Sequence, residues 1–401
     1  MIKEPPNNLI NPLSLKPETI QTLSQQYGTP IYIYNSDIIT ERWKILKSFL
    51  PDYINIYYSI KANPNPEVIN AFKNLGARFE AASIGEINIV QNKGCGNAEK
   101  IIFVGPAKSD YDLEKAIEQK VYIIAESANE LERINAICQN KGIVQSIAIR
   151  INPGKGNGTI STGGKTQFGI DINTLPALSR SLSKYKNILV NGLHFYLGTG
   201  ILQEKLIIDN LKIILEATKK AIYDLKIDLQ FLDIGGGLGI PYHENENELN
   251  LTRIKDDFVY LIDTFRKETP SLKEIAFEAG RYLVGPSGIF AAKVIDIKSS
   301  FGIQYIILDG GTSNFNIDTH YYGFKSLPFS VFTDNPDKHD IYTICGPLCT
   351  STDRLAVDIR CQIPNIGDII AFYQAGAYGF SASPGLFLSR GFPKEVFYKP
   401  I

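Results

Sequence analysis

Short apolar runs rich in Ile and Val recur through the first two thirds of the chain, with helix-like segments between them. The runs are Ile54–Ile60, Arg78–Ala82, Ile101–Gly105, Val121–Ala125, Ser146–Asn152, Leu189–Tyr196, Phe231–Ile234 and Ile275–Glu278. Strands that are apolar on both faces are typical of a parallel sheet covered by helices on both sides. Gly76 and Gly142 stand where two of the intervening helices should end. Eight such units in roughly 230 residues predict a (β/α)₈ barrel of the TIM type rather than an open sheet.

The pattern changes after about residue 285, where strand-like segments are separated by Gly, Pro and Asn turns and helix patterns nearly vanish. We therefore predict a barrel domain over residues 38–285 and a β domain built from residues 1–37 and 286–401. The strand-like run Ile31–Asn35 is expected to join the β domain. The Gly-rich stretch Pro153–Gly164 is expected to be either a mobile lid or an ordinary long surface loop.

Composition excludes several classes of function. The chain has 401 residues with 41 basic and 42 acidic side chains, and this balance argues against a general nucleic-acid or membrane-surface binder. The five cysteines include no Cys-x-x-Cys pair, and the four histidines have no metal-binding spacing, so no metal is expected. There is no apolar run of ~18 residues and no signal-peptide pattern, so we expect a cytoplasmic protein.

Chemically competent side chains lie at the predicted carboxyl ends of the strands, where barrels of this type place their active sites. They include Lys61, Arg281, Glu278 and the glycines of Gly235–Gly237. Each has an ordinary alternative: Lys61 could extend into solvent, the glycines could form a simple turn, and Glu278 could belong to a structural salt bridge. Together, a lysine for a Schiff base, a phosphate-binding turn and a carboxylate for a heterocycle nitrogen describe a pyridoxal phosphate site.

Nine stretches, which span almost the whole chain, carry a family resemblance. They are YYSIKAN (57–63), FEAASIGEI (79–87), IIFVGPAKS (101–109), ESANEL (126–131), GLHFYLGTG (192–200), LDIGGGLG (232–239), FEAGRYLVGPSG (277–288), CGPLCTSTD (345–353) and GAYGFSAS (376–383). The chain thus resembles the fold-type III pyridoxal phosphate decarboxylases, the family of diaminopimelate, ornithine and arginine decarboxylases. The diaminopimelate branch looks nearest.

The resemblance implies an α/β barrel followed by a β domain, in a head-to-tail homodimer with shared active sites. Lys61 would hold the cofactor, Glu278 would face its pyridine nitrogen, and Cys349 would come from the partner subunit to reprotonate the carbanion left by CO₂. Tyr196 stands where many members have a histidine that stacks on the ring, and His194 lies two residues earlier. The other implied cofactor contacts are Glu80, Arg150, Thr199, Gly236, Gly237, Gly280, Arg281 and Tyr378.

Departures from the family pattern bear on the substrate. In the diaminopimelate branch a glutamate after the catalytic cysteine grips the distal amino group, but Thr350 stands here. The arginine that binds the distal carboxylate is also missing from residues 309–323, where Ile317 or a neighbour takes its place, and Arg354 is not expected to substitute for it. Burying both distal charges of meso-diaminopimelate without partners would cost several kcal/mol.

We therefore expect decarboxylation of a conjugated or carrier-bound amino acid in a biosynthetic pathway, such as a siderophore or natural-product pathway, with Thr350, Asp353 and Tyr378 near the substrate. The alternatives are a diaminopimelate decarboxylase or a decarboxylase of a free basic amino acid. A racemase of this fold is less favoured, because it has an arginine opposite the pyridine nitrogen, where this chain has Glu278. A non-catalytic cofactor-homeostasis protein shares the barrel but lacks the β-domain motifs.

Overall fold

The computed structural model describes residues 3–92, 100–243, 245–315 and 327–400. The chain divides into two compact units. One comprises residues 44–239 and 249–279, and the other comprises residues 1–43, 240–248 and 280–401. No helix in the described part of the chain is long and apolar enough to cross a membrane.

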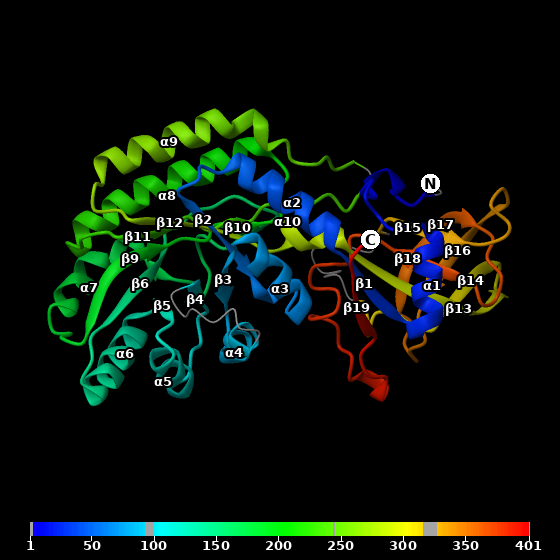
Figure 1. Cartoon of the computed structure of the whole chain (residues 1–401), viewed down its shortest axis with the longest axis horizontal. Helices are drawn as coiled ribbons and strands as arrows, with labels where there is room; N and C mark the ends of the chain where they lie inside the picture. Colours follow the sequence, from blue (N-terminus) through cyan, green and yellow to red (C-terminus); the bar gives the residue numbers. More distant parts are fainter. Residues whose placement is uncertain (1–2, 93–99, 244, 316–326, 401) are drawn as a thin grey trace. The chain divides into compact units, whose positions relative to one another are not determined.

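The first unit is a closed barrel of parallel strands, as the strand pattern predicts (Figure 1). Its strands are β2 (Ile54–Ser59), β3 (Arg78–Ala81), β4 (Ile101–Phe103), β5 (Tyr122–Ala125), β6 (Gln145–Asn152), β9 (Ile188–His194), β11 (Phe231–Asp233) and β12 (Glu274–Ala279). Pairing of β5 with β6 and of β12 with β2 completes the ring. The barrel prediction is therefore confirmed, and every predicted apolar run contributes one strand.

Helices alternate with these strands. They are α3 (Pro66–Leu75), α4 (Ile84–Asn92), α5 (Asp110–Glu118), α6 (Ala128–Lys141), α7 (Leu175–Leu182), α8 (Glu204–Leu225) and α9 (Lys255–Glu268). The side chains of Asn65, Ser109 and Ser127 accept hydrogen bonds from backbone N–H groups in the first turns of α3, α5 and α6. Gly76 and Gly142 end α3 and α6 in the left-handed conformation, which confirms the expected helix ends.

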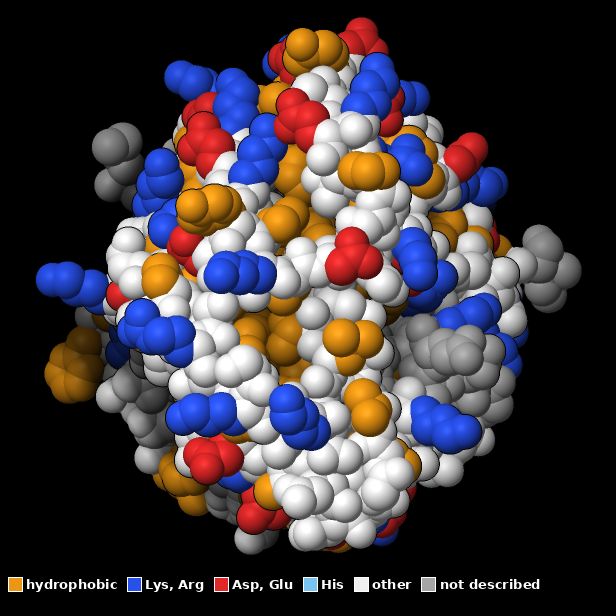
Figure 2. Space-filling view, turned by 90° about the vertical axis from the view of Figure 1, so that its left-hand side faces the viewer, with side chains coloured by type: hydrophobic (Ala, Val, Ile, Leu, Met, Phe, Trp, Pro, Cys, Tyr) orange, Lys and Arg blue, Asp and Glu red, His pale blue; other side chains and the backbone are white. Residues whose placement is uncertain are grey.

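Aromatic side chains fill the barrel interior toward the end where the strands begin. Tyr57 and Phe231 belong to a buried cluster against which Tyr122 packs, and a Cβ on Gly192 would overlap the Tyr122 hydroxyl. A cavity of about 300 Å³ lies there, lined partly by these rings. Figure 2 shows apolar side chains in a hollow with Lys and Arg side chains gathered around it. These aromatic side chains occupy the end of the barrel where the strands begin, and the candidate site lies at the opposite, carboxyl end of the strands.

The stretch Pro153–Gly164 is paired with the segment that follows β9. Its residues Ile160–Ser161 (β7) form an antiparallel pair with Gly198–Thr199 (β10). The backbone N–H of Thr159 donates to the Thr199 carbonyl at 2.8 Å. A Cβ on Gly158 would come within 2.8 Å of the Thr199 nitrogen, so glycine is needed for this close approach. The Gly-rich stretch is thus tied to the strand that carries Thr199.

The second unit contains the β domain. Its strands are β1 (Ile31–Asn35), β13 (Gly288–Ser300), β14 (Ile303–Leu308), β15 (Phe329–Phe332), β16 (His339–Cys345), β17 (Arg354–Gln362), β18 (Ile369–Phe372) and β19 (Lys394–Tyr398). Strand β1 pairs antiparallel with β13 and parallel with β19, which confirms that Ile31–Asn35 joins this sheet. The unit also includes α1 (Pro17–Tyr27) and the short α10 (Arg281–Val284), and α2 (Ser36–Phe49) runs through residues 43–44, where the chain passes into the barrel.

Candidate active site

Lys61 follows β2 in a short 3₁₀ turn at the carboxyl end of the barrel. Its ammonium donates to both carboxylate oxygens of Glu80 at 2.7 and 2.8 Å. The Lys61 side chain is 40% exposed, whereas the Glu80 side chain on β3 is fully buried. The ring of Tyr196 has its centroid 5.9 Å from the Lys61 nitrogen. The amine is therefore reachable from solvent but is held in one direction by a buried anion.

Glu278 at the end of β12 is buried and lies beside His194 at the end of β9. Nε2 of His194 is 3.1 Å from Oε1 of Glu278. Burial disfavours the Glu278 carboxylate, but the nearby His194, Lys61 and Arg150 groups outweigh it, so the pKa of Glu278 is lowered. Burial and the Glu278 charge raise the pKa of Asp233 on β11 well above its usual value. The two neighbouring buried carboxyl groups therefore have pKa values shifted in opposite directions.

Two buried polar atoms of this group have no hydrogen-bond partner among the residues that the structure describes. They are Nδ1 of His194 and Oδ2 of Asp233. Donor atoms of His194, Asp233 and Glu278 lie within 4.8 Å of one another, although no metal spacing is visible in the sequence. Such a set forms only when three strands of the closed barrel meet. A buried orphan donor or acceptor indicates a bound group or water that completes its hydrogen bonding.

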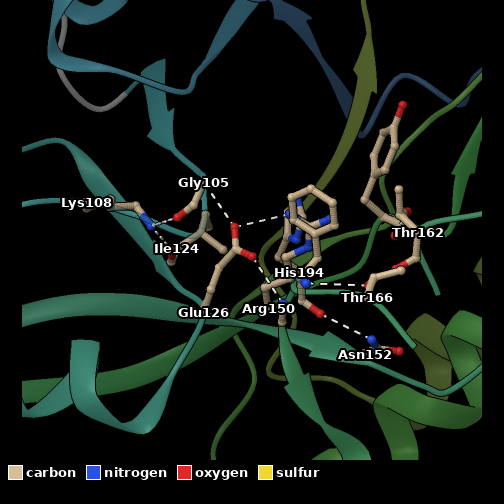
Figure 3. Close-up of polar contacts among 12 residues, drawn as sticks. Gly105, Lys108, Ile124, Glu126, Arg150, Asn152, Thr162, Thr166 and His194 are labelled. Atoms are coloured by element: carbon tan, nitrogen blue, oxygen red, sulfur yellow. Dashed lines mark hydrogen bonds and ion pairs between the residues drawn. The ribbon is translucent and has the colours of Figure 1, made fainter. Parts of the chain in front are cut away.

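Arg150 is fixed by a buried acid that the sequence interpretation did not single out. Nη1 of Arg150 donates to Oε1 of Glu126 at 3.1 Å, and the same oxygen accepts from the Gly105 N–H at 2.9 Å (Figure 3). The other Glu126 oxygen accepts from the Gly169 N–H at 3.1 Å. Glu126 therefore links the ends of three neighbouring strands and the loop before β8 (Ile170–Asp171). Its position directly after the run Val121–Ala125 was the signal that could have identified it.

The glycine turn after β11 packs so closely that side chains are excluded. A Cβ on Gly236 would overlap the carbonyl oxygen of Glu278, and one on Gly237 would overlap the carbonyl oxygen of Gly198. Gly237 also has a φ of 89°. The backbone N–H groups of Gly236 and Gly237 donate to no acceptor among the described residues. Two adjacent free N–H groups, with Thr199 on the neighbouring β10, are suited to an anion such as phosphate.

The remaining predicted site residues lie in the β-domain unit. Arg281, which follows Gly280, donates to the Tyr242 hydroxyl at 2.9 Å, and its guanidinium lies 4.6 Å from the centroid of the Tyr378 ring. Tyr378 has a φ of 64°, an uncommon conformation for a residue of its size. The structure thus brings Arg281 and Tyr378 together within this unit.

The loop between β16 and β17 carries Cys349 and Thr350, both exposed. Its conformation depends on the buried Asp353. One Asp353 oxygen accepts from the N–H and the hydroxyl of Thr312 at 2.7 and 2.8 Å, and the other accepts from the Leu348 N–H at 2.8 Å. The carboxylate is therefore used within the protein to hold the loop in place.

Glu86 near the start of α4 provides a test of the site's electrostatics. Burial raises its pKa to about 7, and the Glu80 charge adds to this against the opposing effects of the Ala82 N–H and Lys61. A folded-state pKa above the unfolded value of 4.5 gives stability that is complete below that value and lost as the pH rises toward 7. The free energy of unfolding of the wild type should fall by about 2 kcal/mol between about pH 5 and about pH 8 because of Glu86, and Glu86→Gln should remove this fall. Urea unfolding at about pH 5 and about pH 8 measures it, and parallel profiles for both proteins would contradict the assignment.

The fold and the site define a pyridoxal phosphate enzyme built on a barrel. Residues 36–285 match the family model described as the pyridoxal binding domain of pyridoxal-dependent decarboxylases. The chain belongs to this family of decarboxylases, and it is a carboxy-lyase that uses pyridoxal 5′-phosphate.

Two curated relatives match nearly the whole chain. The L-glutamyl-[BtrI acyl-carrier protein] decarboxylase of Niallia circulans is 31% identical and covers 96% of this chain and 92% of its own length. The 2-[(L-alanin-3-ylcarbamoyl)methyl]-2-hydroxybutanedioate decarboxylase of Staphylococcus aureus is 30% identical, with 96% and 97% covered. Among solved structures, diaminopimelate decarboxylase from Helicobacter pylori complexed with L-lysine superposes with a TM-score of 0.83 at 29% identity, covering 94% and 93%.

The residues present fit this cofactor. Lys61 offers a solvent-accessible amine for its aldehyde, and the free N–H groups of Gly236 and Gly237 offer donors for its phosphate. Glu278 offers a buried anion with a lowered pKa for a protonated pyridine nitrogen. The bound cofactor supplies an electron sink that stabilises the carbanion left when a carboxylate departs as CO₂.

Proposed function

We propose that this enzyme removes the α-carboxylate of an amino acid whose side chain is extended by a conjugate or a carrier link. The observation that carries the proposal is Thr350, an exposed and uncharged residue directly after Cys349. A free diamino acid needs an opposite charge for its distal ammonium, because an unpaired charge is costly to bury. A substrate whose distal part continues out of the pocket needs none. Ile317, the expected replacement for the distal arginine, lies outside the described residues.

The two curated relatives support this substrate class. The name of one specifies an L-glutamyl group on an acyl-carrier protein, and the name of the other specifies an alanin-3-yl group joined through a carbamoyl link to a hydroxybutanedioate. Loss of an α-carboxylate requires that this carboxylate be free. The link to a carrier or conjugate must therefore run through the side chain, away from the reacting carbon.

In this proposal the barrel residues hold the cofactor and control protons around it. Lys61 holds the cofactor, and the Glu80 carboxylate orients the Lys61 nitrogen for proton transfer. Glu278 keeps a proton on the pyridine nitrogen, and His194 positions Glu278 through the contact at 3.1 Å. We assign ring stacking to Tyr196 rather than His194, since the imidazole already faces Glu278. The phosphate is assigned to Thr199, Gly236 and Gly237.

We further propose a homodimer in which each subunit supplies Cys349 to the active site of its partner. The family resemblance implies this arrangement, and the exposure of Cys349 on a loop held by Asp353 supports it. A thiol can donate the proton that the substrate carbon needs after CO₂ has left. Gly280, Arg281 and Tyr378 are assigned to the phosphate region on the basis of the same resemblance.

Decarboxylation of meso-diaminopimelate is the second candidate. The similarity to the Helicobacter pylori enzyme favours it, because that structure is complexed with L-lysine and matches most of both chains. A diaminopimelate decarboxylase of Aquifex aeolicus is also 30% identical over 91% of this chain. The two candidates differ in whether the distal end of the substrate is charged and enclosed.

Measurement of CO₂ release by the cofactor-loaded enzyme distinguishes the candidates. The panel contains free meso-diaminopimelate, lysine, ornithine, arginine and glutamate, together with the thioester that joins the side-chain carboxyl of L-glutamate to 4′-phosphopantetheine. We expect the thioester to be used with a kcat/KM at least about tenfold above any free amino acid, because one well-placed polar contact is worth that much. Brisk release from free meso-diaminopimelate or lysine would contradict the proposal and support the second candidate.

A further inference from the structure

A groove in the β-domain unit lies next to the loop that carries Cys349. Its volume is about 460 Å³, and it is lined by Lys3, Ser351, Thr352, Arg354 and Val357. Two of these side chains are cationic and two carry hydroxyl groups, whereas none carries a carboxylate. The ionisable side chains that line the groove therefore carry only positive charge, which suits an anion.

The fold holds the backbone of the groove in place. The N–H of Arg360 on β17 donates to the Lys3 carbonyl at 2.7 Å, and Lys3 forms a β-bridge with Ile359. Arg354 is the first residue of β17 and pairs with Cys345 of β16. Between them, Asp353 fixes the loop through its hydrogen bonds to Thr312 and Leu348. The backbones of Lys3 and Arg354 are thus both held by β17.

The charges of Lys3 and Arg354 are available. Within the described part of the chain, neither side chain forms an ion pair with an Asp or Glu side chain. Arg354 is exposed, and its planar guanidinium can donate two parallel hydrogen bonds to a phosphate or carboxylate. The carboxylate oxygens of the neighbouring Asp353 accept hydrogen bonds from Thr312 and Leu348 inside the loop.

The groove is also within reach of the reacting end of the substrate. Ser351 is two residues from Cys349 and Arg354 is five residues away, so their Cα atoms lie at most about 7 and about 18 Å from that of Cys349. An anion carried at the far end of an extended side chain could therefore reach the groove while the α-carbon lies near the thiol.

We propose that this groove binds the anionic group, a phosphate or a carboxylate, on the distal part of the conjugated substrate. The inference rests on the proposed function. Arg354 is still not expected to replace the arginine that binds the distal carboxylate of meso-diaminopimelate. Instead, it binds an anionic group further along an extended substrate. Lys3, Ser351 and Thr352 complete the site.

Matched probes test the groove. The cofactor-loaded enzyme is assayed with the side-chain thioester of L-glutamate to 4′-phosphopantetheine and with the same thioester of pantetheine, which lacks the phosphate. We expect Arg354→Gln to raise KM for the phosphorylated probe about tenfold, leave kcat unchanged and leave KM for the other probe unchanged. Lys3→Gln should act in the same direction. Added salt should reproduce the loss, because the groups are exposed.

Arg360→Gln is the control variant. Arg360 is exposed on the same strand and is not among the residues that line the groove, so the substitution removes the same charge outside the groove. A second probe pair identifies a carboxylate source: the amide of 2,3-diaminopropionate with citrate is compared with its N-acetyl analogue. If Arg354→Gln raises KM only for the citrate-derived probe, the groove binds carboxylates. If it raises KM only for the phosphorylated probe, the groove binds phosphate.

Two outcomes would overturn the inference, and they are distinguishable from failure of the proposed function. If the conjugates are decarboxylated and Arg354→Gln changes neither pair, the groove proposal is wrong and the function stands. Calorimetric binding of 4′-phosphopantetheine alone, without an aminoacyl group, tests the groove independently of turnover. Binding to the wild type that Arg354→Gln abolishes supports an anion site even where turnover fails. Equal binding by both proteins overturns it, as does binding by neither unless Arg354→Gln raises KM for the citrate-derived probe.

Discussion

Substituting Lys61 by alanine should abolish the covalent attachment of pyridoxal phosphate and lower kcat/KM by at least about 10³-fold, within the range of a lost proton-transfer group. The visible absorbance of the lysine-linked cofactor should disappear. Borohydride reduction followed by peptide mass spectrometry should label the wild type at Lys61 alone. The variant should also unfold more easily, because the buried Glu80 carboxylate loses the ammonium that donates to both of its oxygens.

Lys61→Arg separates the two effects. Arginine keeps a positive charge for Glu80 but cannot form the covalent link, so stability should be largely retained while absorbance and activity are lost. Cys349→Ala is the complementary variant, since it should keep the absorbance and lose correct product formation. A Lys61→Ala enzyme with an intact cofactor spectrum would show that another amine holds the cofactor and that the site assignment is wrong.

Gly236→Ala should have the largest effect on the fold of the barrel. The added Cβ would overlap the carbonyl oxygen of Glu278, which is backbone and cannot rotate away. Overpacking of this kind costs about 3 kcal/mol or more, and urea unfolding of the cofactor-free protein measures it. Movement of Glu278 away from the turn should also weaken cofactor binding.

Gly85→Ala is the matched control, because a Cβ there meets only the Ser83 hydroxyl at an ordinary 3.5 Å. Gly85 lies in α4, where alanine is the better helix former, so stability should change by less than about 1 kcal/mol or rise. Equal unfolding midpoints for the two variants would show that the turn after β11 has more room than the structure gives it.

The sequence predicts the barrel because the pattern of a buried parallel strand is contained in a few consecutive residues. Each strand is a short apolar run, and the helices α3 and α6 end at Gly76 and Gly142, which adopt the left-handed conformation. Lys61 and Glu278 are identifiable for a similar reason. A charged residue at the end of an apolar run is unusual, and the barrel fold brings all such ends to one side.

Contacts between residues that are far apart in the sequence have no local pattern of this kind. The position of Glu126 after an apolar run is visible in the sequence, but its partners Arg150, Gly105 and Gly169 become apparent only in the folded barrel. The low pKa of Glu278 likewise depends on His194, which lies 84 residues earlier in the chain. The pairing of Pro153–Gly164 with the Thr199 segment could not be read from the sequence, because glycine-rich stretches have little side-chain pattern.

The buried hydrogen bonds of Asp353 have a consequence for the evolution of specificity. Through this one carboxylate, the segment after β14 and the Cys349 loop share a single conformation, although they are about 40 residues apart. Neither Gly311 nor Gly346 has room for a side chain beside that carboxylate. The two segments are therefore expected to change together in evolution. Moving the cysteine loop alone into a relative would separate Asp353 from Thr312, which helps to fix the loop.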